Sequence, residues 1–131
     1  MMKLFFDGAS RGNPGKAAYG FVIKDAGGST VRYGNGYLGV ATNNEAEYEG
    51  LIHGLVDAIN QKYDKVEIHG DSMLVCKQVL GEWKVKAPNL VPYRTHALKL
   101  YNMIPEASIS QVPRSENSEA DALANQALDK Q

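Results

Sequence analysis

Four acidic residues, spread along the chain, are the side chains best placed to do chemistry. Each stands near the end of a predicted strand or the start of a predicted helix, beside apolar residues that would turn it inward: Asp7, Glu47, Asp71 and Asp121. Carboxylates that converge in a partly buried place repel one another, by roughly 4 kcal/mol for a pair about 4 Å apart at an effective dielectric constant near 20. Such a cluster needs a divalent cation or must take up protons. Because carboxylate oxygens are hard ligands, the pattern indicates Mg²⁺ or Mn²⁺ rather than zinc.

Each acid taken alone also has a structural explanation. Asp7 belongs to an Asp-Gly pair, which is common in turns and would end its strand, and Asp71 could cap the helix that follows it. Asp121 is predicted in the first turn of the last helix, where the helix dipole stabilises any carboxylate. Glu47 is harder to explain, because a charged residue rarely begins the apolar stripe of a helix. That stripe continues at Leu51, Leu55 and Ala58.

The elements that must position these acids follow from hydrophobic periodicity and turn signals. Gly27-Gly28 predicts a hairpin turn between the second and third strands, and Thr42 with Glu45 forms a capping box at the start of the first helix. Strands are predicted at residues 3–7, 19–24, 31–38, 66–69 and 107–112, and helices at 42–61, 72–80, 89–103 and 118–128. This order predicts an α/β fold with a mixed five-stranded sheet, in which three antiparallel strands precede two helix-linked parallel strands and helices flank the sheet.

The predicted fold gives the four acids a reason to meet. Ligands of open α/β sheets gather outside the carboxyl ends of parallel strands, and both Asp7 and Asp71 are predicted at such ends. Glu47 and Asp121 lie near the starts of helices that could border the same crevice. Four residues that are ambiguous one by one therefore predict a single shared metal site.

Length and composition limit the class of protein. The chain has 131 residues, of which 44% are hydrophobic, which is enough for one domain covering residues 1–131. No apolar stretch approaches the roughly 20 residues that span a bilayer, so we expect a cytoplasmic protein without a membrane partner and take a monomer as the default. The single cysteine, Cys76, lies in an apolar helical pattern and is expected to be a buried structural thiol. A formal net charge of −1 argues against non-specific coating of nucleic acid but allows a local basic groove.

Four ordered segments of the chain resemble the signature segments of type 1 ribonuclease H. They are DGASRGNPG at residues 7–15, TNNEAE at 42–47, GDS at 70–72 and ENSEAD at 116–121. Four motifs in order over essentially the whole chain are far more specific than any one of them. The resemblance implies the ribonuclease H-like fold and an endonuclease that hydrolyses the RNA strand of RNA/DNA hybrids, leaving 5′-phosphate and 3′-hydroxyl ends. It also implies two Mg²⁺ ions, with Mn²⁺ as a substitute, held by the catalytic residues Asp7, Glu47, Asp71 and Asp121.

The same resemblance implies contacts with the substrate. Asn13, Asn43 and Asn44 would read the minor groove and the 2′-hydroxyl groups that distinguish RNA from DNA. Thr42 would contact a phosphate of the DNA strand, and Asn89 could join that contact from the start of the third helix. Helix capping is the alternative explanation for Asn43, Asn44 and Asn89.

The loop before the last aspartate departs from the family pattern. Many members carry a histidine there, whereas residues 111–116 contain none, and His53, His69 and His96 all lie elsewhere. Arg114 is the best substitute and is expected to join the catalytic residues by engaging a phosphate, although arginine is too basic to act as a general base. A solvated loop arginine is the alternative.

This chain is also short in a region that binds substrate in larger relatives. Those relatives carry a basic helical protrusion or a separate hybrid-binding domain, whereas this chain has only residues 81–88 in the equivalent place. Affinity for a hybrid should therefore be modest and sensitive to salt. Trp83 in this segment could stack on a sugar or cover the core, and we expect it to cover the core. Arg11 and Lys16, near the first acidic motif, could add positive charge locally.

Two other functions stay open at this point. One is a related nuclease of relaxed specificity that also cuts double-stranded RNA or RNA–DNA junctions, because the missing histidine and protrusion loosen the usual constraints. The other is a non-catalytic hybrid-binding module, against which the four intact acids argue. A small-molecule binding protein is disfavoured, since residues 13–15 form neither a P-loop nor a dinucleotide fingerprint.

Overall fold

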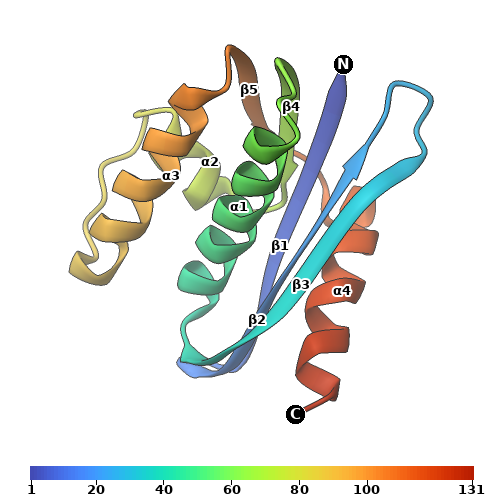
Figure 1. Ribbon diagram of the computed structural model, residues 1–131. Coiled ribbons are helices and arrows are strands. Elements are labelled where there is room, and N and C mark those ends of the chain that lie inside the picture. Colours follow the sequence, from blue (N-terminus) through green and yellow to red (C-terminus); the bar gives the residue numbers. More distant parts are fainter.

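Alternating apolar and polar residues produce five strands in the order that the sequence predicts. The computed structural model describes all residues from 1 to 131. The strands are β1 (Met2–Gly12), β2 (Gly15–Lys24), β3 (Thr30–Ala41), β4 (Lys65–Gly70) and β5 (Glu106–Gln111). β1, β2 and β3 pair antiparallel, and β4 and β5 extend the sheet in parallel beyond β1, in the order β3-β2-β1-β4-β5 (Figure 1). The predicted mixed five-stranded sheet is confirmed.

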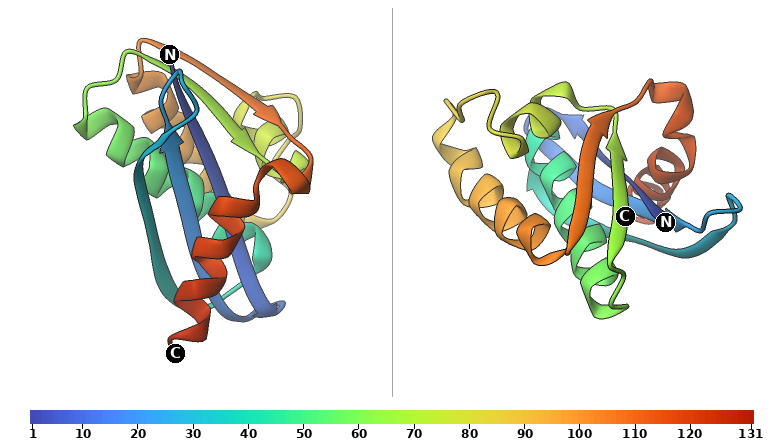
Figure 2. Two further views of the ribbon diagram at one scale, coloured as in Figure 1. Left: turned by 90° about the vertical axis from the view of Figure 1, so that its right-hand side faces the viewer. Right: turned by 90° about the horizontal axis from the view of Figure 1, so that it is seen from above.

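Helices cover both faces of this sheet. They are α1 (Asn43–Asn60), α2 (Met73–Val79), α3 (Val91–Met103) and α4 (Ser118–Asp129), with short 3₁₀ helices η1 (Pro88–Leu90) and η2 (Arg114–Glu116). Figure 2 shows α1, α2 and α3 on one face and α4 alone on the other, where it packs mainly on β2. No helix is long and apolar enough to cross a bilayer.

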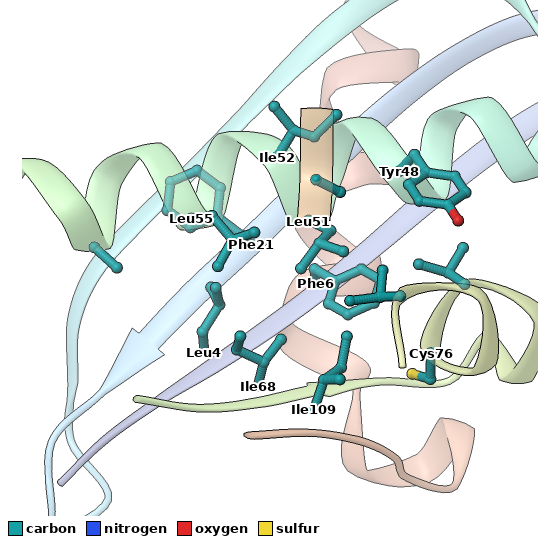
Figure 3. Close-up of a cluster of buried hydrophobic side chains, with 14 of the residues drawn as sticks. Leu4, Phe6, Phe21, Tyr48, Leu51, Ile52, Leu55, Ile68, Cys76 and Ile109 are labelled. Atoms are coloured by element: carbon teal, nitrogen blue, oxygen red, sulfur yellow. The ribbon is translucent and has the colours of Figure 1, made fainter. Parts of the chain in front are cut away.

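The main core lies between the sheet and α1. Figure 3 shows Leu4, Phe6, Ile68 and Leu51 packed together there, and all four are 0% exposed. Cys76 on α2 borders the same core at 3% exposure, and burial raises the pKa of its thiol to about 11. The prediction of a buried structural thiol is confirmed, because a thiol with that pKa carries almost no thiolate at neutral pH.

The start of α1 is formed by the predicted capping box. The Thr42 hydroxyl accepts a hydrogen bond from the Glu45 backbone N–H at 3.1 Å, and the Glu45 carboxylate accepts one from the Thr42 N–H at 2.8 Å. Two amide groups that have no partner within the helix are thereby satisfied. The first turn of α1 is fixed in place, and with it the residues that follow on the same helix.

Three structural expectations were wrong. β1 does not end at Asp7, because its pairing with β2 continues to Gly12; only its pairing with β4 stops, at Phe6 opposite Gly70. α3 begins at Val91 rather than at residue 89, since Pro92 has no N–H to donate to the residue four positions earlier. Trp83 does not cover the core, because the segment between α2 and η1 contains no helix and leaves its side chain 45% exposed.

Candidate active site

Asp7 and Asp71 come from neighbouring parallel strands. Asp7 is the first residue of β1 beyond its pairing with β4, and Asp71 directly follows the last residue of β4. Both therefore stand at the same carboxyl edge of the sheet, where α/β proteins bind ligands. Asp7 is only 3% exposed, and its Oδ1 accepts a hydrogen bond from the Gly8 N–H at 2.9 Å.

The capping explanation for Asp71 is wrong. Ser72 is the N-cap of α2, and its hydroxyl accepts a hydrogen bond from the Val75 N–H at 3.2 Å. The carboxylate of Asp71 is thus not engaged in starting the helix. It lines the same cleft as Asp7 instead.

Two glycines let α1 approach β1 closely enough to bring Glu47 beside Asp7. A Cβ atom added at Gly8 would lie 2.3 Å from backbone atoms of Ala46 and Glu47, and one added at Gly50 would lie 2.5 Å from the Asp7 carbonyl oxygen. Side chains at either position would push the helix away from the strand. The Asp-Gly pair at the start of the first motif therefore serves a close helix–strand contact rather than a turn.

A Gly8→Ala substitution should lower the free energy of unfolding by at least about 1–3 kcal/mol, because the methyl group can only be accommodated by moving backbone. Urea denaturation measures the change. Gly27→Ala is the matched control, since a Cβ there meets only the Asp25 carboxylate at 3.4 Å and should change stability by less than about 0.5 kcal/mol. Equal denaturation midpoints for the two variants would contradict this explanation of the α1–β1 contact.

Three carboxylates converge where these elements meet. Asp7, Glu47 and Asp71 each place one carboxylate oxygen within 4.8 Å of the others. The Oε2 atom of Glu47 is buried and has no hydrogen-bond partner. A buried carboxylate oxygen without a partner is costly unless a cation or proton occupies the space beside it. This all-oxygen donor set fits a hard divalent cation.

The electrostatics of the cluster support the same fit. Burial raises the pKa of Asp7 to about 7, and the neighbouring Asp71 and Asp121 carboxyls add to the rise. Burial, together with the charges of Asp7 and Asp71, raises the pKa of Glu47 well above its usual value. Without a cation, the cluster holds protons near neutral pH that a bound divalent ion would displace.

Asp121 lines the same open cleft, of about 610 Å³, as the three clustered carboxylates. It lies in the first turn of α4 and outside the group of three carboxylates, although it is close enough to raise the pKa of Asp7. The start of α4 is tied to β1 by Asn117, which is 1% exposed and donates a hydrogen bond from Nδ2 to the Phe6 carbonyl at 2.8 Å. This link between Asp7 and Asp121 was missed in the sequence, because an asparagine before a helix indicates an N-cap, and the Asn117 side chain makes no capping bond.

Only some of the remaining predicted site residues line the cleft. Asn43, Asn44 and Arg114 line the cleft. Asn13 lies beside it, and its Oδ1 accepts a hydrogen bond from the Asn43 N–H at 3.1 Å. Thr42, as the N-cap of α1, and Asn89, on η1, lie outside the cleft lining. Because Thr42 caps α1 and Ala87 is the N-cap of η1, capping does not account for the three asparagines at 43, 44 and 89.

Five further polar residues line the cleft without having been predicted as site residues, and no histidine does. These five are Ser10, Arg11, Ser72, Gln111 and Asn125. Gln111 donates a hydrogen bond to the Asp71 carbonyl at 3.4 Å, and Asn125 donates one to the Asp121 carbonyl at 3.0 Å. Their polar side chains are ordinary in exposed strand ends and helices, so the sequence alone holds little signal for them.

Comparison with known proteins identifies similar chains. Residues 5–127 match the family model described as "Reverse transcriptase-like". A relative from Halobacterium salinarum, named "Ribonuclease HI", is 48% identical over 95% of this chain. This chain spans 63% of the length of that relative and 34% of the length of mycobacterial relatives that are 45% identical.

Solved structures agree with these sequence matches. The crystal structure of RNase H1 from Halobacterium salinarum superposes with a TM-score of 0.96 at 46% identity, covering 99% of this chain and 98% of that one. The structure of LC11-RNase H1 in complex with an RNA/DNA hybrid superposes with a TM-score of 0.93 at 37% identity, covering 99% of this chain and 98% of that one. The fold predicted from the four motifs is therefore confirmed.

Proposed function

The chain belongs to the type 1 ribonuclease H family, and we propose that it hydrolyses the RNA strand of RNA/DNA hybrids with the help of divalent metal ions. The observation that carries this proposal is the convergence of Asp7, Glu47 and Asp71 within 4.8 Å, with one buried Glu47 oxygen lacking any partner. The hybrid-bound relative at 37% identity supports the choice of substrate. The expected products are a 5′-phosphate and a 3′-hydroxyl.

The four acids would hold two Mg²⁺ ions, for which Mn²⁺ could substitute. When bound, the ions would lower the pKa of the attacking water and neutralise charge on the departing 3′ oxygen. The carboxylates of Asp7, Glu47 and Asp71 supply the negative charge that holds such ions at the edge of the sheet. Asp121, which lines the same cleft, would complete the set from α4.

The asparagines at the start of α1 would recognise the RNA strand. Asn43 and Asn44 line the cleft one turn before Glu47, so their amide groups can donate to and accept from 2′-hydroxyls near the metal site. Asn13 would hold this turn in place through its hydrogen bond to the Asn43 N–H. Thr42 and Asn89, which lie outside the cleft lining, would contact a phosphate of the DNA strand.

Arg114 would contact a phosphate of the substrate, and Arg114→Ala should lower kcat/KM about 10-fold because one charge-assisted hydrogen bond is lost. Lys99→Ala, which removes an exposed positive charge on α3, should change kcat/KM less than two-fold and serves as the control. Arg114→His should be active at low pH and lose activity as pH rises through about 6.5, where an unperturbed imidazole loses its charge. Steady-state cleavage rates at several pH values test these predictions. Equal kcat/KM for Arg114→Ala and the unaltered protein would contradict the contact between Arg114 and a phosphate.

Labelling the two strands of a hybrid separately tests the proposed reaction. The RNA strand should be cut and the DNA strand left intact, and the new RNA ends should be a ligatable 5′-phosphate and an extendable 3′-hydroxyl. Cutting of the DNA strand, or a 2′,3′-cyclic phosphate product, would overturn the proposed chemistry.

A nuclease of relaxed specificity is the second candidate, and the absence of any histidine from the cleft lining is the observation that favours it. The same assay with an RNA/RNA duplex and with an RNA–DNA junction separates the two candidates. We also propose that a monomer is the active unit, because the cleft of a single chain already contains all four acids. A cytoplasmic location stays a prediction.

A further inference from the structure

The cleft extends well beyond the acidic cluster, along β1 toward the far end of α4. Its floor is formed by consecutive β1 residues from Asp7 to Arg11, and Asn125 and Leu128 of α4 line its side. Figure 1 shows the C-terminal end of α4 and the β1–β2 turn at the same end of the sheet. Arg11 and Arg114 are the two basic residues in the lining. Arg114 lies three residues after Gln111, which bonds to Asp71, and Arg11 lies on β1 four residues beyond Asp7.

Arg11 is placed on the same face of β1 as Asp7. Side chains alternate along a strand, and the pairing of β1 with β2 runs without a bulge from Lys3 to Gly12. Residues 7, 9 and 11 therefore share the face that α4 covers, in agreement with the packing of Ala9 against Leu128 of α4 and its neighbours. At about 3.3 Å per residue, Arg11 stands roughly 13 Å along the strand from Asp7.

Arg11 pairs with the carboxylate of Asp129, which does not stabilise α4. The guanidinium forms an ion pair with Asp129, the last residue of α4, and the two side chains are 53% and 66% exposed. Exposed ion pairs contribute little to stability. The helix dipole disfavours a negative charge in the last turn, so Asp129 is not there to stabilise α4. The pair is therefore easily exchanged for another anion.

We propose that Arg11 binds a backbone phosphate of the nucleic acid a few nucleotides from the bond that is cut, and that Asp129 competes with this phosphate for the guanidinium. The inference rests on the proposed function for its substrate. Phosphates follow each other every 3.4 Å of axial rise along one strand of a DNA duplex, so a separation of roughly 13 Å spans a few nucleotides. A guanidinium matches a phosphate group in a bidentate manner, which makes the exchange favourable.

The test exploits the opposite effects expected for the two partners of one ion pair. Arg11→Ala should raise KM for a hybrid about five-fold with kcat changed less than two-fold, because the contact is remote from the reacting atoms. The slope of log KM against log salt concentration should fall by about 0.7–0.9, the value of one phosphate contact. Asp129→Asn should lower KM about two-fold, because the competing carboxylate is gone. Arg11→Lys should restore part of the affinity and the full slope.

The control variant is Lys65→Ala. It breaks another exposed ion pair, between Lys65 and Glu106, and removes one positive charge. Neither of these two residues lines the cleft. The control variant should leave KM and the salt slope unchanged. A merely structural pair would make Arg11→Ala and Asp129→Asn shift KM in the same direction or not at all, and either result would overturn the proposal.

The outcome can be separated from the proposed function. Cleavage by the unaltered protein tests the function alone, and the difference between variants tests Arg11 alone. If the unaltered protein cuts no duplex, the proposed function fails. Equilibrium binding of a fluorescent hybrid to the unaltered protein and to Arg11→Ala then still tests whether Arg11 contacts a phosphate. Equal dissociation constants and equal salt slopes would overturn it.

Discussion

Replacing Glu47 by glutamine should slow cleavage of an RNA/DNA hybrid by at least about 10³-fold, more than the loss of a single transition-state hydrogen bond in other enzymes. Glu47 supplies the buried oxygen that has no partner in the protein. Glutamine keeps the size of the side chain but offers one neutral carbonyl oxygen and an NH₂ group that repels a cation. Single-turnover rates at saturating metal concentration measure the effect, and Asp71→Asn should behave in the same way.

Glu49→Gln is the matched control for this prediction. Glu49 lies two residues further along α1, contacts His53 at 3.5 Å and does not line the cleft. Its substitution removes the same charge from the same helix and should change the rate less than two-fold. A Glu47→Gln variant that cleaves as fast as the Glu49→Gln variant would remove Glu47 from the metal site.

Asp7→Asn should stabilise the metal-free protein at pH 8 while abolishing cleavage. The pKa of Asp7 is raised from 3.8 to about 7, mainly by burial, so the folded protein disfavours the charged carboxylate. The contribution of the protonated Asp7 carboxyl to the free energy of unfolding is fully present below pH 3.8 and is lost as pH rises through about 7. A shift of this size corresponds to roughly 2–4 kcal/mol at pH 8, which the neutral amide should recover. Urea denaturation in EDTA at several pH values measures the difference, which should shrink toward pH 4.

Adding a divalent cation should offset most of this difference in stability. An ion that binds only the folded state at 100 times its dissociation constant stabilises by about 2.7 kcal/mol. The unaltered protein should gain that stabilisation, whereas Asp7→Asn should gain little because it has lost a ligand. An Asp7→Asn variant that is less stable than the unaltered protein in EDTA, and still cuts RNA, would overturn the assignment of the metal site.

Periodicity predicted the type and order of every strand and α-helix, because burial on one face imposes a period of two on strands and of about 3.6 on helices. It missed where β1 ends. The Asp-Gly pair at residues 7–8 has the composition of a turn, but Gly8 is required by the contact with α1, which only the tertiary structure shows. Likewise, Trp83 is apolar enough for a core, yet its segment has no element to carry it inward.

The sequence predicted the acidic residues of the candidate site more completely than the residues that position them. Asp7, Glu47 and Asp71 meet as expected, since strand ends and an apolar helix stripe determine where they point. Asp121 lines the same cleft but lies outside the group of three, and its position depends on how α4 docks on the sheet. That docking is fixed in part by Asn117, which bonds to a backbone carbonyl 111 residues away in sequence. Contacts of this range leave no periodic pattern.

The central claim is that the acidic cleft is a metal-dependent active site for RNA/DNA hybrids. The most direct test is one cleavage assay on end-labelled RNA/DNA, RNA/RNA and DNA/DNA duplexes of the same sequence, each with Mg²⁺, with Mn²⁺ and with EDTA. We predict cutting of RNA in the hybrid with either metal, none in EDTA, and none of the DNA/DNA duplex. Binding of the hybrid without cutting under any condition would contradict the claim and identify the chain as a binding module.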